Sequence, residues 1–94
     1  MMDIKERNQL FEKLEDRFGI NGQVVQTFEE FAECQKELSK WIRGKADMAD
    51  LAEEIADVEI MLEQMKYFLE LDDFVEAFKE SKFQRIKERY GGTV

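Results

Sequence analysis

The chain has 94 residues, among them 22 acidic and 14 basic side chains, one cysteine, no histidine and no proline. This length predicts a single domain over residues 1–94 that buries only about 60–65% of the surface exposed by the unfolded chain. The net charge of −8 disfavours binding to nucleic acid polymers and to anionic membranes. The lack of histidine excludes Ser/His/Asp and Cys/His catalysis as well as zinc-finger sites.

The single cysteine, Cys34, excludes a disulfide within the chain. No apolar run approaches the roughly 20 residues that cross a bilayer, and no signal peptide is expected. We therefore expect a protein of the reducing cytoplasm that does not bind membranes.

The first predicted helix runs from about Asp3 to Phe18. Asp3 and Glu6 have the spacing of a capping pair. Its expected apolar stripe consists of Ile4, Phe11, Leu14 and Phe18. We expect Gly19-Ile20-Asn21-Gly22 to end this helix.

The second predicted helix begins at about Gly22 or Gln23 and ends at Ile42, before Arg43-Gly44-Lys45. Its apolar side chains are expected to be buried, namely Val24, Phe28, Phe31, Leu38 and Ile42. The other flank is polar and carries Gln26, Glu30, Glu33 and Glu37.

The third predicted helix follows Asp47, a good N-cap, and is the most regular. Its apolar residues alternate spacings of three and four, at Met48, Leu51, Ile55, Val58, Leu62, Met65 and Leu69. The chain is expected to turn near Leu71-Asp72-Asp73 into a fourth helix, with Asp73 and Glu76 in capping-box spacing. Its apolar face comprises Phe74, Phe78, Ile86 and Tyr90. The short connections predict an all-α, antiparallel bundle of four helices.

Two acidic motifs lie on the second and third predicted helices, E-E-F-A-E at residues 29–33 and E-E-I-A-D at residues 53–57. In each motif two carboxylates stand three residues apart and therefore point from one helix face: Glu30 with Glu33, and Glu54 with Asp57. If the helices pack antiparallel, the four form a carboxylate box that is costly without a cation. Oxygen ligands favour Mg²⁺. Acidic pairs are also common on solvated helix faces, so that reading stays open.

The pattern E-x-x-E, a gap of about twenty residues and then E-x-x-D resembles the signature of the MazG-like all-α nucleoside triphosphate pyrophosphohydrolases. The likeness is greatest to the short, single-domain members from phages and Gram-positive bacteria, and it covers roughly residues 24–90. Downstream, residues 82–85 read K-F-Q-R and resemble the K-F-x-R segment of the family. Cys34 departs from the family pattern, in which leucine is common at this position.

The resemblance implies a helical bundle that assembles as a dimer or a dimer of dimers. It implies cleavage of nucleoside triphosphates between the α and β phosphates, with Mg²⁺ as cofactor and Mn²⁺ as a substitute. It also implies roles for six residues: metal ligation by Glu30, Glu33, Glu54 and Asp57, and phosphate contact by Lys82 and Arg85.

The residues themselves are compatible with this chemistry. Bound Mg²⁺ lowers the pKa of a water and neutralises charge on a phosphoryl group, and one carboxylate can accept the proton. Glu33 and Glu54 are our candidates for the catalytic base, although the sequence leaves the choice among the four open. Lys45, in the loop beside the box, is a further candidate for phosphate contact. Lys82 and Arg85 belong to a basic stripe whose alternative role is pairing with surface glutamates.

Two other functions fit the same sequence. The heptad pattern of the third helix is typical of a non-catalytic, all-α interaction module. The charge of −8 on a small domain also fits an acidic regulator or DNA mimic. No motif that reads a base is present, so neither base nor sugar preference is predicted.

Overall fold

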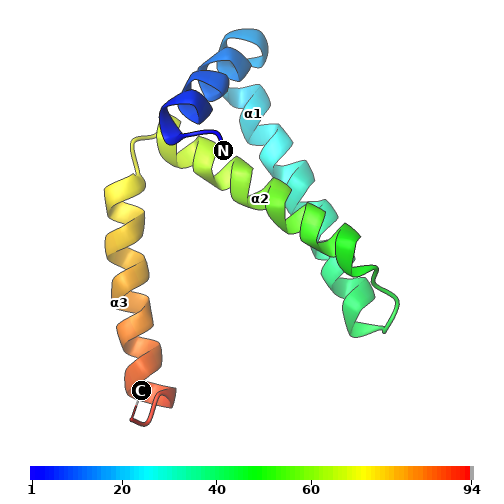
Figure 1. Cartoon of the computed structure of the whole chain (residues 1–94), viewed down its shortest axis with the longest axis vertical. Coiled ribbons are helices and arrows are strands. Elements are labelled where there is room, and N and C mark those ends of the chain that lie inside the picture. Colours follow the sequence, from blue (N-terminus) through cyan, green and yellow to red (C-terminus); the bar gives the residue numbers. More distant parts are fainter. Residues whose placement is uncertain (94) are drawn as a thin grey trace.

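The structure is a computed structural model and describes residues 1–93. Its regular elements are three helices, α1 (Ile4–Ile42), α2 (Met48–Phe68) and α3 (Asp72–Tyr90). In Figure 1, α1 and α2 run side by side in opposite directions, and α3 leaves their upper end as a separate arm. The predicted all-α class is therefore confirmed. No helix in the described residues is long and apolar enough to cross a bilayer.

Three elements stand where four helices were expected, because α1 contains both of the first two predicted helices, joined across a kink at Gly19. The break that we expected at residues 19–22 is confined to Gly19, which has φ 77° and ψ 157°. This backbone conformation is almost restricted to glycine. The helix resumes at once after the bend, and the segment before Gly19 folds back across the end of α2 (Figure 1).

Two of the three predicted N-caps are confirmed. A side-chain oxygen of Asp3 accepts a hydrogen bond from the backbone N–H of Glu6 at 2.8 Å. Asp47 accepts two such bonds at the start of α2, at 2.8 and 3.1 Å. The cap predicted at Asp73 is wrong, because the cap position lies two residues earlier, at Leu71, which makes no side-chain capping bond. The two confirmed caps satisfy backbone donors that a helix start leaves free.

The contact between α1 and α2 is partly polar, where an apolar core was expected. Three apolar side chains are buried among the described residues, Phe11, Leu51 and Met61. Three polar side chains are buried as well, Gln23, Thr27 and Gln64. Gln64 Nε2 donates to Gln23 Oε1 at 2.9 Å, and Thr27 Oγ1 donates to the carbonyl oxygen of Gln23 at the same distance. Each buried polar side chain therefore makes at least one hydrogen bond, to a side chain or to the backbone.

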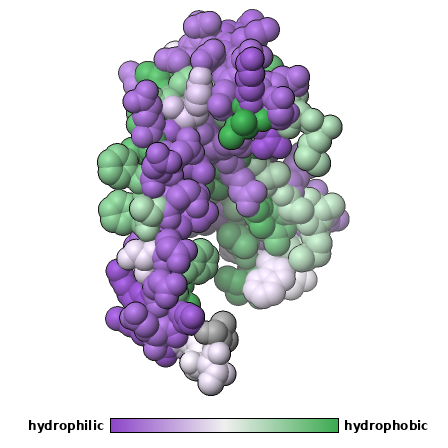
Figure 2. Space-filling model, turned by 60° about the vertical axis from the view of Figure 1, so that its left-hand side comes forward, coloured by the Kyte–Doolittle hydropathy of each residue, from purple (hydrophilic) through white to green (hydrophobic). Residues whose placement is uncertain are grey.

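Much of the predicted apolar stripe of each helix lies at the surface. Phe28 is 62% exposed on α1 and Ile55 is 40% exposed on α2. The reason is that α1 and α2 meet along the line through Gln23 and Thr27, which turns the apolar flank outward. Figure 2 shows apolar side chains, in green, at the surface between polar ones. The apolar core expected of the bundle is thus only partly formed in the described residues.

The arm α3 has no buried residue. Within the described chain no Cα atom of α3 lies within 8 Å of one in α1, and α3 contacts α2 alone. The turn before it is short and hydrogen-bonded: Leu71 N–H donates to the Lys66 carbonyl at 2.9 Å, and Glu70 has a φ of 54°. The direction of α3 is therefore set by the turn rather than by packing.

Candidate metal centre

The hydrogen bond between the two buried glutamines aligns the acidic motifs. On α1, Glu30 and Glu33 follow the buried glutamine by seven and ten residues. On α2, Asp57 and Glu54 precede its partner by seven and ten residues. The two helices run in opposite directions and have the same rise per residue. Residues that lie equally many positions from the bonded glutamines therefore lie at the same height along the helix pair. Glu30 is therefore level with Asp57, and Glu33 is level with Glu54.

Three carboxylates converge at this height. One oxygen each from Glu30, Glu33 and Glu54 lies within 4.8 Å of the other two. Glu30 and Glu54 are half-buried, and Glu33 is exposed. No other set of three acidic or cysteine side chains in residues 1–93 comes this close. Asp57, the fourth predicted ligand, is half-buried one turn along α2 and lies outside the set of three.

Several oxygens at this site are shielded from solvent and lack a hydrogen-bond donor. Gln26 Nε2 donates to Glu30 Oε1 at 2.8 Å, but Glu30 Oε2 is buried without a partner. Glu54 Oε2 is likewise buried without a hydrogen-bond partner. Glu37, two turns along α1 from Glu30, pairs with Lys40 at 2.9 Å through one oxygen and leaves the other buried and unpaired. Because unpaired buried acceptors are costly, this donor set fits a hard divalent cation.

The electrostatics agree with that fit. Burial raises the pKa of Glu54 above its usual value, and the carboxylates of Glu33, Asp57 and Glu30 raise it further. None of these four carboxylates forms an ion pair with a lysine or arginine in the part of the chain described. A bound cation would supply the missing positive charge.

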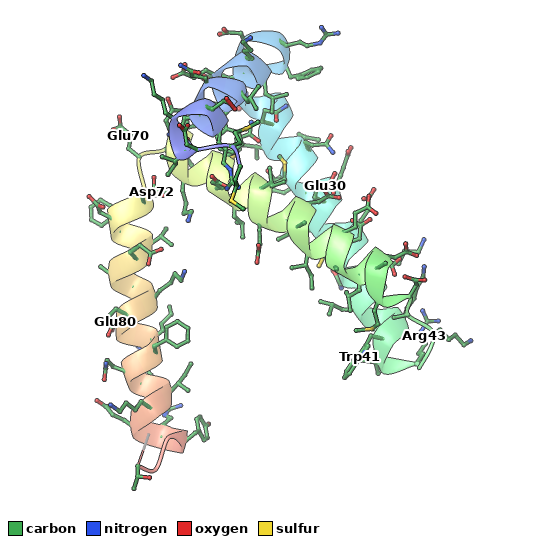
Figure 3. The ribbon with its side chains drawn as sticks, in the orientation of Figure 1. Glu30, Trp41, Arg43, Glu70, Asp72 and Glu80 are labelled. Atoms are coloured by element: carbon green, nitrogen blue, oxygen red, sulfur yellow. The ribbon has the colours of Figure 1, made fainter. Side chains whose placement is uncertain are left out.

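The predicted phosphate-binding residues lie elsewhere in the single chain. Lys45 is exposed in the loop that joins α1 to α2, two residues after Arg43 in the sequence. Lys82 and Arg85 are exposed on α3, no Cα atom of which lies within 8 Å of one in α1. Figure 3 shows the same separation, with Glu30 on the stretch of α1 beside α2 and Glu80 on the arm. One chain therefore does not bring the basic stripe to the carboxylates.

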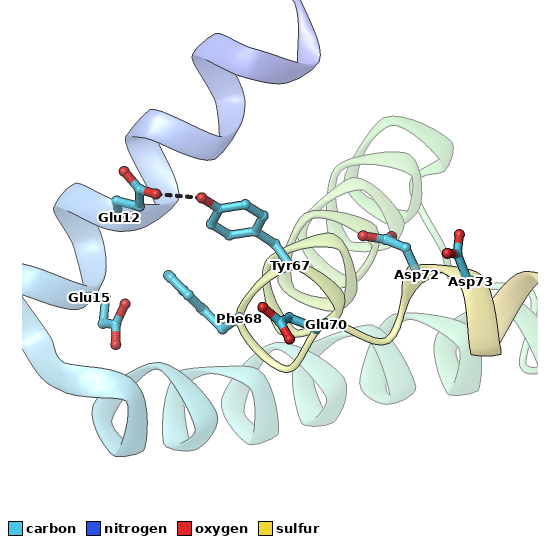
Figure 4. A pocket seen from close by; sticks show the side chains of 7 residues that line it. All are labelled: Glu12, Glu15, Tyr67, Phe68, Glu70, Asp72 and Asp73. Atoms are coloured by element: carbon cyan, nitrogen blue, oxygen red, sulfur yellow. Dashed lines mark hydrogen bonds between the residues drawn. The ribbon is translucent and has the colours of Figure 1, made fainter.

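A second acidic region lies at the other end of the α1–α2 pair (Figure 4). It is a cavity of about 500 Å³ lined by two aromatic and five acidic side chains: Tyr67, Phe68, Glu12, Glu15, Glu70, Asp72 and Asp73. Tyr67 O–H donates to Glu12, which raises the pKa of Tyr67. No three of its carboxylates meet at ligand distance, so the cavity does not share the geometry of the first site.

Sequence reasoning did not assign site roles to Gln26, Glu37 and the buried glutamine pair. The helical spacing could have indicated Gln26 and Glu37, because they lie four and seven residues from Glu30 and therefore on the same helix face. Nothing in the sequence indicated that the two glutamines are buried, since glutamine is mostly exposed and rarely lies in a contact between helices.

Comparison with known proteins gives no match, either to a family model, to a curated protein or to a solved structure. The MazG-like resemblance therefore stays a prediction, and the function is argued from the site itself.

Proposed function

We propose that the protein is a Mg²⁺-dependent nucleoside triphosphate pyrophosphohydrolase of the MazG-like type. Water would attack at the α–β phosphoanhydride of a nucleoside or deoxynucleoside triphosphate to give a monophosphate and pyrophosphate. In this proposal the enzyme acts as a homo-oligomer in the cytoplasm and removes surplus or non-standard nucleotides.

The observation that carries the proposal is the convergence of Glu30, Glu33 and Glu54, together with the unpaired buried oxygens of Glu30 and Glu54. An acidic helix face that only solvates a protein has no need to bury carboxylate oxygens without donors. These oxygens are well suited to a divalent cation, and Mn²⁺ would serve as a substitute.

The roles of the residues follow from their environments. Glu30, Glu33 and Glu54 would hold the ion, with Asp57 joining them after a side-chain rotation. Mg²⁺ in this position supplies charge neutralisation and a bound water of lowered pKa. Glu33, the exposed member, is open to solvent and suited to accept a proton from the attacking water, whereas Glu54 is shielded. Lys45, Lys82 and Arg85 are the proposed phosphate contacts.

The first experiment measures ion binding and catalysis together. At one hundred times its Kd, Mg²⁺ would stabilise the folded protein by about 2.7 kcal/mol, which raises Tm on the order of 10 °C for a domain of this size. Purified protein should also release pyrophosphate from a panel of common and damaged nucleoside triphosphates. Absence of both effects would refute the proposal.

Matched variants locate the activity. Glu54→Gln should abolish pyrophosphate release and the Mg²⁺-dependent rise in Tm while helicity is kept. Glu59→Gln is the control, because it removes one charge from an exposed position on the same helix. Equal losses in both variants would mean that net charge, and not the site, controls the activity.

A non-catalytic interaction module is the second candidate, because a large apolar surface is exposed. This candidate predicts a stable complex with a protein partner and no effect of Mg²⁺ on Tm. The acidic regulator or DNA mimic would instead bind a basic partner, through the charge of −8.

A further inference from the structure

The helix α3 has two unlike halves. Successive residues turn by about 100° around a helix, and on this basis one half carries all its large apolar side chains: Phe74, Val75, Phe78, Phe83, Ile86 and Tyr90. The same half also carries four basic side chains, Lys79, Lys82, Arg85 and Arg89. From residue 73 onward every acidic side chain lies on the other half, namely Asp73, Glu76, Glu80 and Glu88. This pattern is suited to docking on a surface that is both apolar and acidic.

The chain leaves that half of α3 uncovered. Phe74 and Phe78 are 66% and 64% exposed, and no residue of the helix is buried. An isolated helix of this length is marginally stable in water without tertiary packing. The helix therefore needs a partner surface.

The amount of uncovered surface matches a second copy of the chain. The accessible area is 7765 Å², whereas a folded monomer of 11.2 kDa typically has about 5,700 Å². The radius of gyration is 16.3 Å, against about 12 Å for a compact chain of this length. The excess of roughly 2,000 Å² per chain is what an obligate homodimer buries.

The charges are complementary as well. Residues 79–90 contain five basic and two acidic side chains, whereas residues 1–71 contain nine basic and seventeen acidic ones. The surface of the α1–α2 pair therefore offers exposed apolar groups beside carboxylates. The short, hydrogen-bonded turn at Leu69–Leu71 keeps the arm away from α1 of its own chain, and the start of the arm stays beside α2 through the ion pair of Asp72 with Lys66.

We propose that α3 of each chain packs on the α1–α2 pair of a second copy and brings Lys82 and Arg85 to that copy's carboxylates. The proposal rests on the proposed function for the role of these two residues. It makes the active site a joint product of two chains, with α1 and α2 from one and α3 from the other. Reciprocal exchange of the arms closes the assembly as a two-fold dimer.

Complementation between two inactive variants tests this arrangement. Glu54→Gln removes a carboxylate, and the double variant Lys82→Ala, Arg85→Ala removes the basic pair. Each homodimer should be inactive. A heterodimer purified through two different tags should recover about half of the wild-type activity, because one of its two sites then combines intact α1–α2 residues with an intact arm. Lys87→Ala, on the acidic half of α3, is the control and should leave activity unchanged.

Cross-linking gives a second readout that does not depend on activity. The native Cys34 follows Glu33 directly and is half-buried and free. In an Arg85→Cys variant, a short bismaleimide should join Cys34 to the new cysteine and give a covalent dimer of twice 11.2 kDa. Lys87→Cys should give far less of this product, and Cys34→Ser should abolish it.

The outcomes separate the two proposals. A cross-link within one chain, a monomer by light scattering, or an active wild type whose heterodimer stays inactive would each overturn the exchange of arms and leave the proposed function standing. A covalent dimer of the Arg85→Cys variant, together with a wild type that lacks pyrophosphohydrolase activity, would support the exchange and refute the function. Circular dichroism of each variant checks that it is folded.

Discussion

Gln64 Nε2 donates a hydrogen bond of 2.9 Å to Gln23 Oε1 in the buried contact between α1 and α2. Gln64 is completely inaccessible, and its Oε1 has no hydrogen-bond partner among the described residues. Sliding one helix along the other would break this bond and leave both amides buried and unpaired. The pair thus specifies the alignment that places Glu33 level with Glu54.

We expect Gln23→Ala to destabilise the protein by about 1–3 kcal/mol, because it leaves the buried Gln64 amide without its acceptor. The double variant Gln23→Leu, Gln64→Leu should cost less, since it removes both polar groups. Urea denaturation measures both free energies of unfolding. A double variant that is less stable than the single one would show that the hydrogen bond does not explain the effect.

The same double variant should weaken Mg²⁺ binding although it leaves every carboxylate in place. The alignment of α1 and α2 is then no longer specified by a polar pair, so Glu30 and Glu33 lose their fixed height relative to Glu54. Isothermal titration with Mg²⁺ measures this effect. Unchanged affinity would mean that the remaining contacts are sufficient for alignment.

Gly19→Ala should destabilise the protein by about 1–3 kcal/mol through backbone strain. The cause is conformational, because a Cβ at Gly19 would meet no atom within 4 Å, whereas φ is 77°. Gly22→Ala is the matched control. Gly22 is helical and its added Cβ would make an ordinary contact of 3.6 Å with Phe18, so this change should stabilise by about 0.5–1 kcal/mol. Thermal denaturation of the two variants should therefore give shifts of opposite sign.

The raised pKa of Glu54 predicts how the stability of the metal-free protein depends on pH. Because the folded state binds this proton more tightly than the unfolded state, the stabilising effect is complete below the usual pKa and is lost as pH rises through the folded-state value. Glu54→Gln cannot lose a proton, so its Tm should exceed that of the wild type increasingly from pH 4 to pH 7, in EDTA. A constant difference would contradict the raised pKa.

Tyr67→Phe should lower Tm, because it removes the hydrogen bond to Glu12 that joins the start of α1 to the end of α2. This bond also raises the pKa of Tyr67, so its contribution is present below the usual tyrosine pKa and is lost as pH rises above it. Asp16→Asn, a change at an exposed side chain of α1 that makes no hydrogen bond or ion pair within the described residues, is the control and should leave Tm unchanged. Equal shifts would contradict the role of the bond.

The sequence predicted those parts of the structure that depend on local rules. Asp3 and Asp47 were recognisable as caps because a short side chain before a helix can bond to the backbone a few residues later. The spacing within each acidic motif likewise indicated that Glu30 and Glu33 share one face. The break expected at residues 19–22 was also a local prediction, and the structure has it at Gly19.

The parts that were not predicted depend on contacts between helices. Apolar periodicity predicted that Phe28 is buried and that Phe78 belongs to an apolar helix face, yet both side chains are exposed. Periodicity identifies a face that needs covering, and it does not say whether the same chain covers it. The buried Gln23 and Gln64 contradict the usual preference of their residue type, and only their mutual hydrogen bond makes that burial acceptable.

The bend at Gly19 also uncouples the orientation of the two parts of α1. A continuous helix transmits any rotation of its front turns to every later side chain, whereas a break in the middle absorbs it. Substitutions or small insertions in residues 4–18 should therefore change the packing of this segment against α2. The distances among the carboxylates of Glu30, Glu33 and Glu54 should stay the same. The sequence of residues 4–18 can therefore change without altering the proposed ion site.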